Sequence, residues 1–211
     1  MPVQEGEYCG FETNIEDPGI LVVTFNRPES LNASTAAMKR DLVELLTQTQ
    51  MDDTIRIVVF TGRGQAFWAG DDLKGYGGDS VQVPQIHHGH HNPSGTYNGL
   101  RTISQAVNTA VRNLDKISIA AINGFAIQTG FSLALACDFR IASRSAKLGS
   151  ATLRFGLLPD EGGQWLLVQH LGVAKAMDFM MRKRIVDGET AFELGLVHEV
   201  VSDNNLMEET L

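Results

Sequence analysis

The sequence is poor in cysteine and in positive charge. Cys9 and Cys137 are its two cysteines, with no CxxC spacing and no Cys/His cluster around them. This argues against a disulfide framework or a structural zinc site and favours a reducing, cytoplasmic setting. Lysine and arginine number 17 against 25 aspartates and glutamates, a net charge of -8. That sign is wrong for a protein that binds a phosphate backbone, so we expect no nucleic-acid partner.

The chain also lacks a recognisable leader and an unbroken membrane-spanning run. Its first ten residues, MPVQEGEYCG, have neither a basic start nor an apolar stretch, so we expect no signal peptide. Residues 117–137 carry no charge, but the pair 123–124 and the polar triplet 128–130 interrupt them. Such breaks would leave backbone groups unsatisfied at mid-bilayer, so we expect no membrane partner.

Short apolar runs alternate with helical patterns along the first two thirds of the chain. The periodicity predicts strands at 20–25, 55–61 and 117–122 and amphipathic helices between them, which indicates an α/β protein with a parallel sheet. A short helix through Leu135 and strand-like stretches at 138–143 and 146–150 follow. The last third is predicted to be mostly helical, from Gln164 to Leu171 and from Val173 to Lys183. We expect residues 1–211 to form a single domain.

Two segments are expected to be irregular. Residues 62–78 follow a predicted strand and are too rich in glycine for regular structure. Residues 74–98 form a long polar loop that contains four histidines, His87, His88, His90 and His91. No carboxylate nearby in sequence would orient these histidines, so we expect no metal site there.

Four stretches, in order along almost the whole chain, resemble the crotonase (enoyl-CoA hydratase/isomerase) superfamily. They are FNRPESLNA at 25–33, AFWAGDDL at 66–73, INGFAIQTGFSLALACD at 122–138 and FGLLPDEGG at 155–163. Residues 156–167 also match a GLxPDxGGxWLL pattern that enoyl-CoA isomerases of the family share. The resemblance implies a crotonase-like ββα superhelix with a parallel sheet, and a coenzyme A thioester as substrate with no cofactor.

The resemblance also implies an assembly. Relatives form trimers or dimers of trimers through helices that follow the stretch matching GLVHEVV, and these helices complete the acyl pocket. This chain stops at Leu211. We therefore expect a homo-oligomer, a trimer or hexamer, that lacks the usual C-terminal helical extension.

An enzyme that makes an enolate from a thioester needs two backbone N–H groups aimed at the carbonyl oxygen. By resemblance, these donors are the amides of Asp71 and Thr129. Both positions depart from the commonest pattern, which has a small residue at 71 and glycines at 128–130. The resemblance assigns substrate and coenzyme A contacts to Arg27, Asn32, Ala33, Ala69, Leu73 and Gly130. Arg27 could meet a phosphate or could be a solvated turn residue, and the sequence does not separate the two.

The acids of the family are replaced or moved in this chain. The positions that match the two glutamates of the hydratases are Ser132 and Thr152, whose hydroxyls cannot act as bases near neutral pH. Asp160 stands where the resembling isomerases carry their catalytic aspartate, and its alternative role is the N-cap of the following helix. Glu161 is a possible second acid, but we expect it to point elsewhere, as an acid in the first turn of that helix.

The resulting hypothesis is an enoyl-CoA isomerase with Asp160 as its single base. Two other classes stay open. One is hydration or thioester hydrolysis on the same fold, with Asp160 or Glu161 directing water. The other is an acyl-CoA-binding protein without catalysis.

Overall fold

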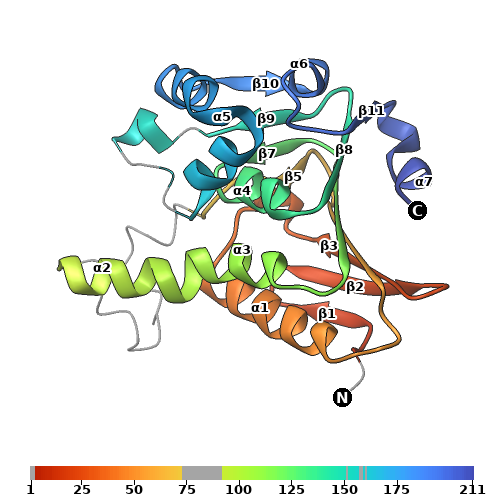
Figure 1. Ribbon diagram of the computed structural model, residues 1–211. Helices are drawn as coiled ribbons and strands as arrows, with labels where there is room; N and C mark the ends of the chain where they lie inside the picture. Colours follow the sequence, from red (N-terminus) through yellow and green to blue (C-terminus); the bar gives the residue numbers. More distant parts are fainter. Residues whose placement is uncertain (1–2, 73–91, 151, 157–158, 160) are drawn as a thin grey trace.

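The computed structural model describes residues 3–72, 92–150, 152–156, 159 and 161–211. The described strands form two sheets, and the described helices pack mainly on one side of the larger sheet (Figure 1). Among the described residues, none of the helices combines the length and the apolar composition of a membrane span.

The larger sheet places its strands in the order β1-β2-β3-β4-β6-β8-β11 within the described chain. These strands are β1 (Gly6–Tyr8), β2 (Phe11–Glu16), β3 (Ile20–Phe25), β4 (Ile57–Gly62), β6 (Ile117–Ile122), β8 (Phe139–Ser143) and β11 (Glu199–Val201). The pairs β1–β2 and β2–β3 are antiparallel, and all later neighbours are parallel. The apolar β-branched runs of β3 and β4 suit central parallel strands, which are buried on both faces.

The smaller sheet has the order β10-β9-β7-β5 in the same described residues. Its strands are β5 (Ala66–Trp68), β7 (Phe125–Ile127), β9 (Lys147–Gly149) and β10 (Ile185–Asp187). Strands β5, β7 and β9 run parallel, so the chain leaves each of them at the same edge of the sheet. That edge carries the segments expected to hold a ligand.

The described helices are α1 (Ala36–Gln50), α2 (Pro93–Gly99), α3 (Gln105–Arg112), α4 (Thr129–Ala136), α5 (Gly163–Met181), α6 (Gly188–Glu193) and α7 (Leu206–Thr210). Short helical turns at Pro28–Ser30, Thr152–Phe155 and Asp203–Asn205, and a π-helical turn at Leu100–Ser104 between α2 and α3, complete the helical structure of the described chain. Helix α1 begins as predicted, because the Thr35 side chain accepts a hydrogen bond from the Met38 amide and caps the first turn.

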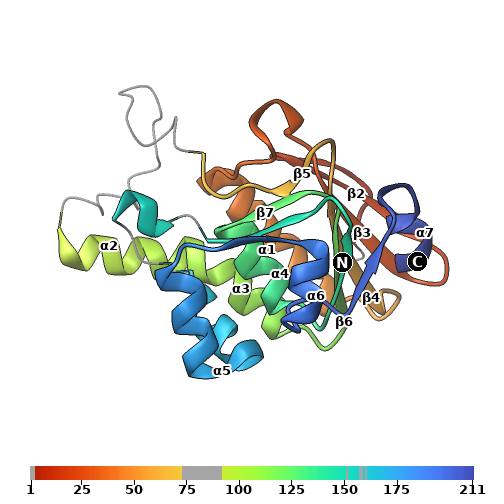
Figure 2. The same ribbon diagram turned by 90° about the horizontal axis from the view of Figure 1, so that it is seen from above.

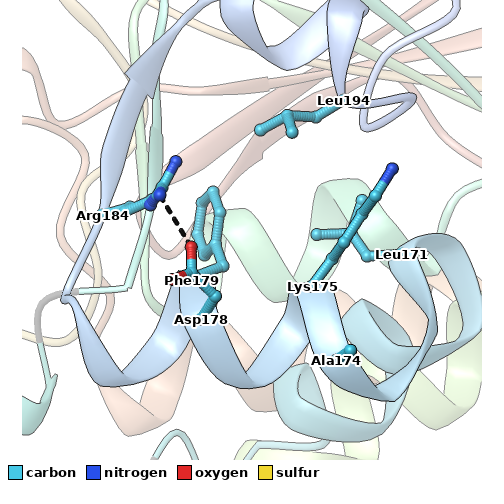
Figure 3. A pocket seen from close by; sticks show the side chains of 7 residues that line it. All are labelled: Leu171, Ala174, Lys175, Asp178, Phe179, Arg184 and Leu194. Atoms are coloured by element: carbon cyan, nitrogen blue, oxygen red, sulfur yellow. Dashed lines mark ion pairs between the residues drawn. The ribbon is translucent and has the colours of Figure 1, made fainter.

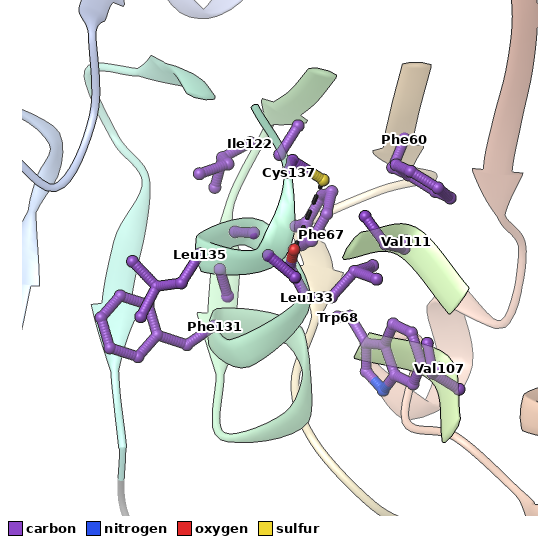
Figure 4. Packing of buried hydrophobic residues seen from close by; sticks show 14 of the residues in the cluster. Phe60, Phe67, Trp68, Val107, Val111, Ile122, Phe131, Leu133, Leu135 and Cys137 are labelled. Atoms are coloured by element: carbon purple, nitrogen blue, oxygen red, sulfur yellow. Dashed lines mark hydrogen bonds between the residues drawn. The ribbon is translucent and has the colours of Figure 1, made fainter. Parts of the chain in front are cut away.

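The main hydrophobic core lies between the sheets and helices α1, α3, α4 and α5. Figure 4 shows Phe67 and Trp68 of β5 packed with Val107 and Val111 of α3, beside α4. The Phe25 ring of β3 makes an edge contact with Trp68 at 4.8 Å between ring centroids. Burial of large aromatic side chains is the main stabilising term in such a core, and here it fixes β5 against the larger sheet.

A second, smaller cluster covers the other face of the larger sheet. Its buried members are Ile20, Val22, Val59, Ala121, Val201 and Leu206. Leu206 comes from α7, which lies on the side of the sheet away from α4 and α5 (Figure 2). This face is packed over by the last helix of the chain.

The predicted strands and helices are confirmed, and several details differ. The pattern does not predict strands β7, β10 and β11. Gly6–Tyr8 and Phe11–Glu16 form strands that the pattern does not predict. Ala66–Trp68 form strand β5 within the segment expected to be irregular. Pro93–Gly99 form α2, so the predicted loop over 74–98 is wrong at its end. The start signals were present, since Asn92 caps α2 by accepting from the Gly95 amide and a proline follows it.

The break in the last long helix is confirmed. Within α5, Gly172 has φ 72° and ψ 163°, which are not helical values, so two helical pieces meet at this residue. A glycine adopts such a positive φ without the steric cost that a side chain would impose. The sequence predicts one helix that ends at Leu171 and another that starts at Val173, and the observed break at Gly172 lies between them.

Selective thiol labelling should distinguish the two cysteines. Cys9 is exposed, whereas Cys137 is buried and burial raises the pKa of its thiol to about 12. Because the thiolate is the reactive form, we expect an alkylating reagent at neutral pH to modify Cys9 and to reach Cys137 only after unfolding. Mass spectrometry of the folded and the urea-unfolded protein tests this. Equal labelling rates at both sites in the folded protein would contradict it.

Candidate active site

The site is built where β5 and β7 end side by side. These strands are parallel, with Ala66 opposite Phe125 and Trp68 opposite Ala126. The chain leaves β5 into residues 69–72 and leaves β7 through Gln128 into helix α4. Both connections therefore lie at one edge of the smaller sheet, and the predicted oxyanion residues Asp71 and Thr129 stand one on each.

A glycine allows the two connections to approach closely. A Cβ atom added to Gly130 would lie 2.0 Å from the Trp68 carbonyl oxygen, far inside any allowed contact. Helix α4 can start directly against β5 because residue 130 has no side chain. The candidate role of Gly130 is thus one of backbone packing.

Gln128 has an unusual backbone conformation. It is the residue before α4, with φ 52° and ψ -106°, values that a non-glycine residue rarely adopts. Its amide donates to the Gly149 carbonyl at 3.0 Å, and its side-chain Nε2 donates to Glu161 Oε1 at 3.1 Å. Both bonds hold this residue in a strained conformation, and strain of this kind is concentrated at functional sites.

The two amides assigned by resemblance to the oxyanion hole are supported by their surroundings. Thr129 is the first residue of α4, so its N–H is one of the helix donors without an intrahelical acceptor. Within the described chain, neither this amide nor that of Asp71 donates to another residue. The Thr129 hydroxyl lies 3.2 Å from Asp71 Oδ1, so the two connections touch at these residues.

A buried ion pair anchors the Asp71 side. Lys39 Nζ of α1 lies 2.6 Å from Asp71 Oδ1, and the Lys39 side chain is only 3% exposed. The Ser34 hydroxyl donates to the same oxygen at 2.9 Å, and Lys39 also donates to Ser104 Oγ at 3.3 Å. These contacts hold the Asp71 carboxylate in place. Removing one partner of the ion pair would leave the other charge buried and uncompensated.

Glu161 lies at the same place, contrary to expectation. Helix α5 begins at Gly163, and its N-cap is Gly162. The N-cap is the alternative role that the sequence offers for Asp160. The prediction of Glu161 as a first-turn acid pointing elsewhere is therefore wrong. Its side chain is 2% exposed, and Glu161 Oε1 lies 3.1 Å from the Thr129 hydroxyl. The Asn108 side chain of α3 fixes the turn by donating to the Glu161 carbonyl at 2.7 Å.

The two positions that match the hydratase glutamates are buried hydroxyls. Ser132 lies three residues into α4 after Thr129 and is 1% exposed, and Thr152 is 2% exposed. The Ser150 and Thr152 hydroxyls lie 2.9 Å apart. A Cβ atom on Gly163 would meet the Ser132 hydroxyl at 2.3 Å, so α5 begins directly against it. Neither position carries an ionisable acid.

The candidate coenzyme A residues divide into two groups. Arg27 Nη2 lies 3.0 Å from Asp72 Oδ2 and Nη1 donates to the Ala33 carbonyl, so Arg27 joins the turn at 27–33 to the segment after β5. Ala33 and Ala69 are half-buried on these connections, and the Ala69 amide donates to the Leu31 carbonyl at 3.1 Å. These residues are placed where a ligand could contact them.

Asn32 has a structural position. It is fully buried with φ 57°, and its Nδ2 donates to the Ala66 carbonyl at 2.6 Å and to the Arg63 carbonyl at 3.0 Å. Its Oδ1 accepts from the Arg27 amide at 2.8 Å. The side chain thus holds the turn onto β5 and faces the protein interior, and a coenzyme A contact of the loop at Asn32 and Ala33 stays a prediction.

Three predicted features lie outside the described residues. They are the candidate base Asp160, the coenzyme A candidate Leu73, and the segment with the four histidines. In the part of the chain that is described, His, Cys, Asp and Glu side chains form no group of three or more that could hold a metal ion.

A surface cavity of about 320 Å³ lies elsewhere, beside α5. Its lining residues are Leu171, Ala174, Lys175, Asp178, Phe179, Arg184 and Leu194 (Figure 3). Arg184 forms an ion pair with Asp178 at 2.7 Å at its edge. None of the candidate site residues that the structure describes lines this cavity, so we do not assign the active site to it.

Comparison with known proteins identifies close relatives. A family model described as enoyl-CoA hydratase/isomerase matches residues 16–211. The chain is 37% identical over 196 residues to 1,2-epoxyphenylacetyl-CoA isomerase of Escherichia coli (strain K12), covering 91% of this chain and 70% of that protein. It is 35% identical over 193 residues to a probable peroxisomal enoyl-CoA hydratase 1 of Arabidopsis thaliana, covering 92% and 67%.

A solved structure matches the fold. The enoyl-CoA hydratase from Bacillus anthracis superposes with a TM-score of 0.85 at 31% identity, over 96% of this chain and 74% of that one. Both isomerase and hydratase names therefore occur among the relatives.

Proposed function

Because the chain belongs to the enoyl-CoA hydratase/isomerase family and has its crotonase fold, we propose that it moves a double bond in an enoyl-CoA by way of an enolate. One observation carries the proposal. Two connections meet at Asp71 and Thr129, whose amides donate to no other residue among those the structure describes, while the positions of the two hydratase glutamates are Ser132 and Thr152. This arrangement supports the formation of an enolate and disfavours the usual two-glutamate addition of water.

The proposed reaction needs one base. Asp160 removes a proton from the α-carbon of a 3-enoyl-CoA, and the electron pair moves toward the thioester oxygen to give a dienolate. The amides of Asp71 and Thr129 stabilise the charge on that oxygen. The same proton then returns to the γ-carbon as a 2,3 double bond forms. No water, oxidant or metal enters the balance, and the thioester remains intact.

The neighbours of Asp160 support its role. Pro159 and Glu161 are both buried, and Glu161 reaches the Thr129 hydroxyl. Glu161, the residue that follows Asp160 in the sequence, therefore lies beside the proposed oxyanion hole. Arg27, Ala33, Ala69 and Leu73 are the proposed coenzyme A contacts on the neighbouring connections.

A second function has one observation in its favour. The Glu161 carboxyl group lies beside the same connection, where it could direct water in a hydration or in thioester hydrolysis. The 35% identity to a probable enoyl-CoA hydratase supports this alternative. It differs from isomerisation in a measurable way, because water becomes part of the product.

Turnover of a 3-enoyl-CoA in ¹⁸O-labelled water tests the choice. We expect a 2-enoyl-CoA of unchanged mass with no label. The same experiment with a 2-enoyl-CoA tests hydration, because water adds to a double bond that is conjugated with the thioester. A labelled 3-hydroxyacyl-CoA formed from the 2-enoyl-CoA would establish hydration, and a labelled free acid from either thioester would establish hydrolysis. Tight binding of both thioesters without any turnover would instead identify a binding protein.

A further inference from the structure

The hydroxyl of Thr129 lies between two carboxyl groups. Its Oγ1 is 3.2 Å from Asp71 Oδ1 and 3.1 Å from Glu161 Oε1. Thr129 is fully buried and Glu161 is 2% exposed, so this contact is formed away from bulk water. A hydroxyl has one proton to donate, whereas an ionised carboxylate can only accept.

The Thr129 hydroxyl donates its proton to Asp71 in preference to Glu161, for the following reason. Its Oδ1 already accepts from Lys39 at 2.6 Å and from Ser34 at 2.9 Å. An oxygen with these partners belongs to an ionised carboxylate, which the buried ammonium group stabilises. Thr129 therefore donates toward Asp71.

If Glu161 were ionised, its oxygen would face a second acceptor at 3.1 Å. It would also place a second negative charge beside the oxygen on which enolate charge develops. Both problems disappear when Glu161 carries a proton and donates it to Thr129 Oγ1, which can accept while donating to Asp71. The Gln128 amide group, 3.1 Å from Glu161 Oε1, can donate to either form.

We propose that Glu161 is protonated in the folded protein and that Glu161, Thr129 and Asp71 form a directed hydrogen-bond relay, in which Glu161 donates to Thr129 and Thr129 donates to the Asp71 carboxylate that Lys39 holds. The relay ties together the two connections that supply the oxyanion-hole amides, so Glu161 and Thr129 are positioning residues. Its catalytic meaning rests on the proposed function. In this relay the side chains of Gln128 and Thr129 contact Glu161, at positions where the resembling enzymes have glycine.

The pH dependence of Glu161 depends on the ionisable groups that lie near it. Among the described elements packed here, Asp71 of the β5 connection and Lys39 of α1 are the titratable groups of the relay. Helix α3 contributes Asn108, and the start of α4 contributes Gln128 and Thr129, none of which titrates. A change in protonation at this site between pH 4 and pH 7 would therefore come from a carboxyl group.

Equilibrium unfolding in urea as a function of pH tests the proton on Glu161. Unfolding releases this proton at any pH above the ordinary glutamate value of about 4.3, because the unfolded chain ionises. The stabilisation is fully present below that pH and is lost as the pH rises. We expect the unfolding equilibrium constant of the wild type, divided by that of Glu161→Gln, to rise about tenfold per pH unit from about pH 5.

The control is Glu44→Gln on the exposed face of α1, for which the same ratio should stay level. A level or falling ratio for Glu161→Gln would overturn the proposal. Infrared spectra at neutral pH give a second measurement that does not need this variant to fold. We expect a carboxylic-acid carbonyl band that Thr129→Ser retains and Thr129→Val shifts. If no such band responds to residue 129, the proposal is wrong.

Kinetics separate positioning from general stability. We expect Thr129→Val to lower kcat by up to about 10²–10³, the effect of losing one oxyanion donor, with little change in KM, and Thr129→Ser to restore kcat. Wild-type kcat in Thr129→Val would contradict the positioning role. A wild-type protein that turns over no enoyl-CoA would overturn the proposed function alone, because the unfolding and infrared measurements require no turnover.

Discussion

Replacing Asp160 by asparagine is expected to lower double-bond isomerisation by about 10²–10⁴ while binding of acyl-CoA is retained, because removing a general base typically has an effect of this size. Asparagine keeps the shape of the side chain and any capping oxygen, but it cannot take a proton from the α-carbon. Steady-state kinetics with a 3-enoyl-CoA and titration of a saturated acyl-CoA measure the two effects separately.

The control for this variant is Glu44→Gln, which removes an exposed carboxylate far from the site in sequence and should keep wild-type kinetics. Full activity of Asp160→Asn together with loss of activity in Glu161→Gln would show that the base is Glu161. That result would also contradict the proton that we assign to Glu161, since a base must be ionised before it acts.

Gly130→Ala is expected to damage the site through the backbone. The new Cβ would lie 2.0 Å from the Trp68 carbonyl oxygen and 2.7 Å from the Trp68 Cβ, so α4 and β5 must move apart. Overpacking of this kind costs about 1–3 kcal/mol of stability. The displacement carries the Thr129 amide away from Asp71, so kcat should fall by about 10²–10³, as when one oxyanion donor is lost.

Urea unfolding and steady-state kinetics measure both effects, and Gly6→Ala is the matched control. Gly6 lies in strand β1, and an added Cβ would have no neighbour within 4 Å. Its stability should stay within about 0.5 kcal/mol of wild type, as for most surface substitutions. If Gly130→Ala kept full stability and kcat, close contact between α4 and β5 would not be needed for the site.

The sequence predicts the strands and helices whose apolar residues follow a regular local pattern. The runs at 20–25 and 117–122 are apolar and β-branched, and they form central strands as expected. Strand β5 escapes prediction because it has three residues and stands among glycines. Its position is decided by Phe67 and Trp68 packing into the core, a tertiary effect that no local period reports.

The polar network of the site is less predictable for the same reason. Lys39 and Asp71 are 32 positions apart, and their contact depends on how α1 lies against the end of β5. A lysine on an amphipathic helix is normally solvated, so its burial has no sequence signal. The sequence predicts Glu161 in the first turn of a helix, where the helix dipole favours an acid, whereas the helix starts two residues later.

In the proposed site, the amides of Asp71 and Thr129 bind the thioester oxygen and Asp160 faces the α-carbon. A crystal structure with a bound acyl-CoA would show both contacts. We expect a thioester oxygen about 2.7–3.1 Å from both amide nitrogens and the Asp160 carboxyl group on the opposite side of the acyl chain. A thioester oxygen bound away from these two amides, or another side chain facing the α-carbon, would contradict it.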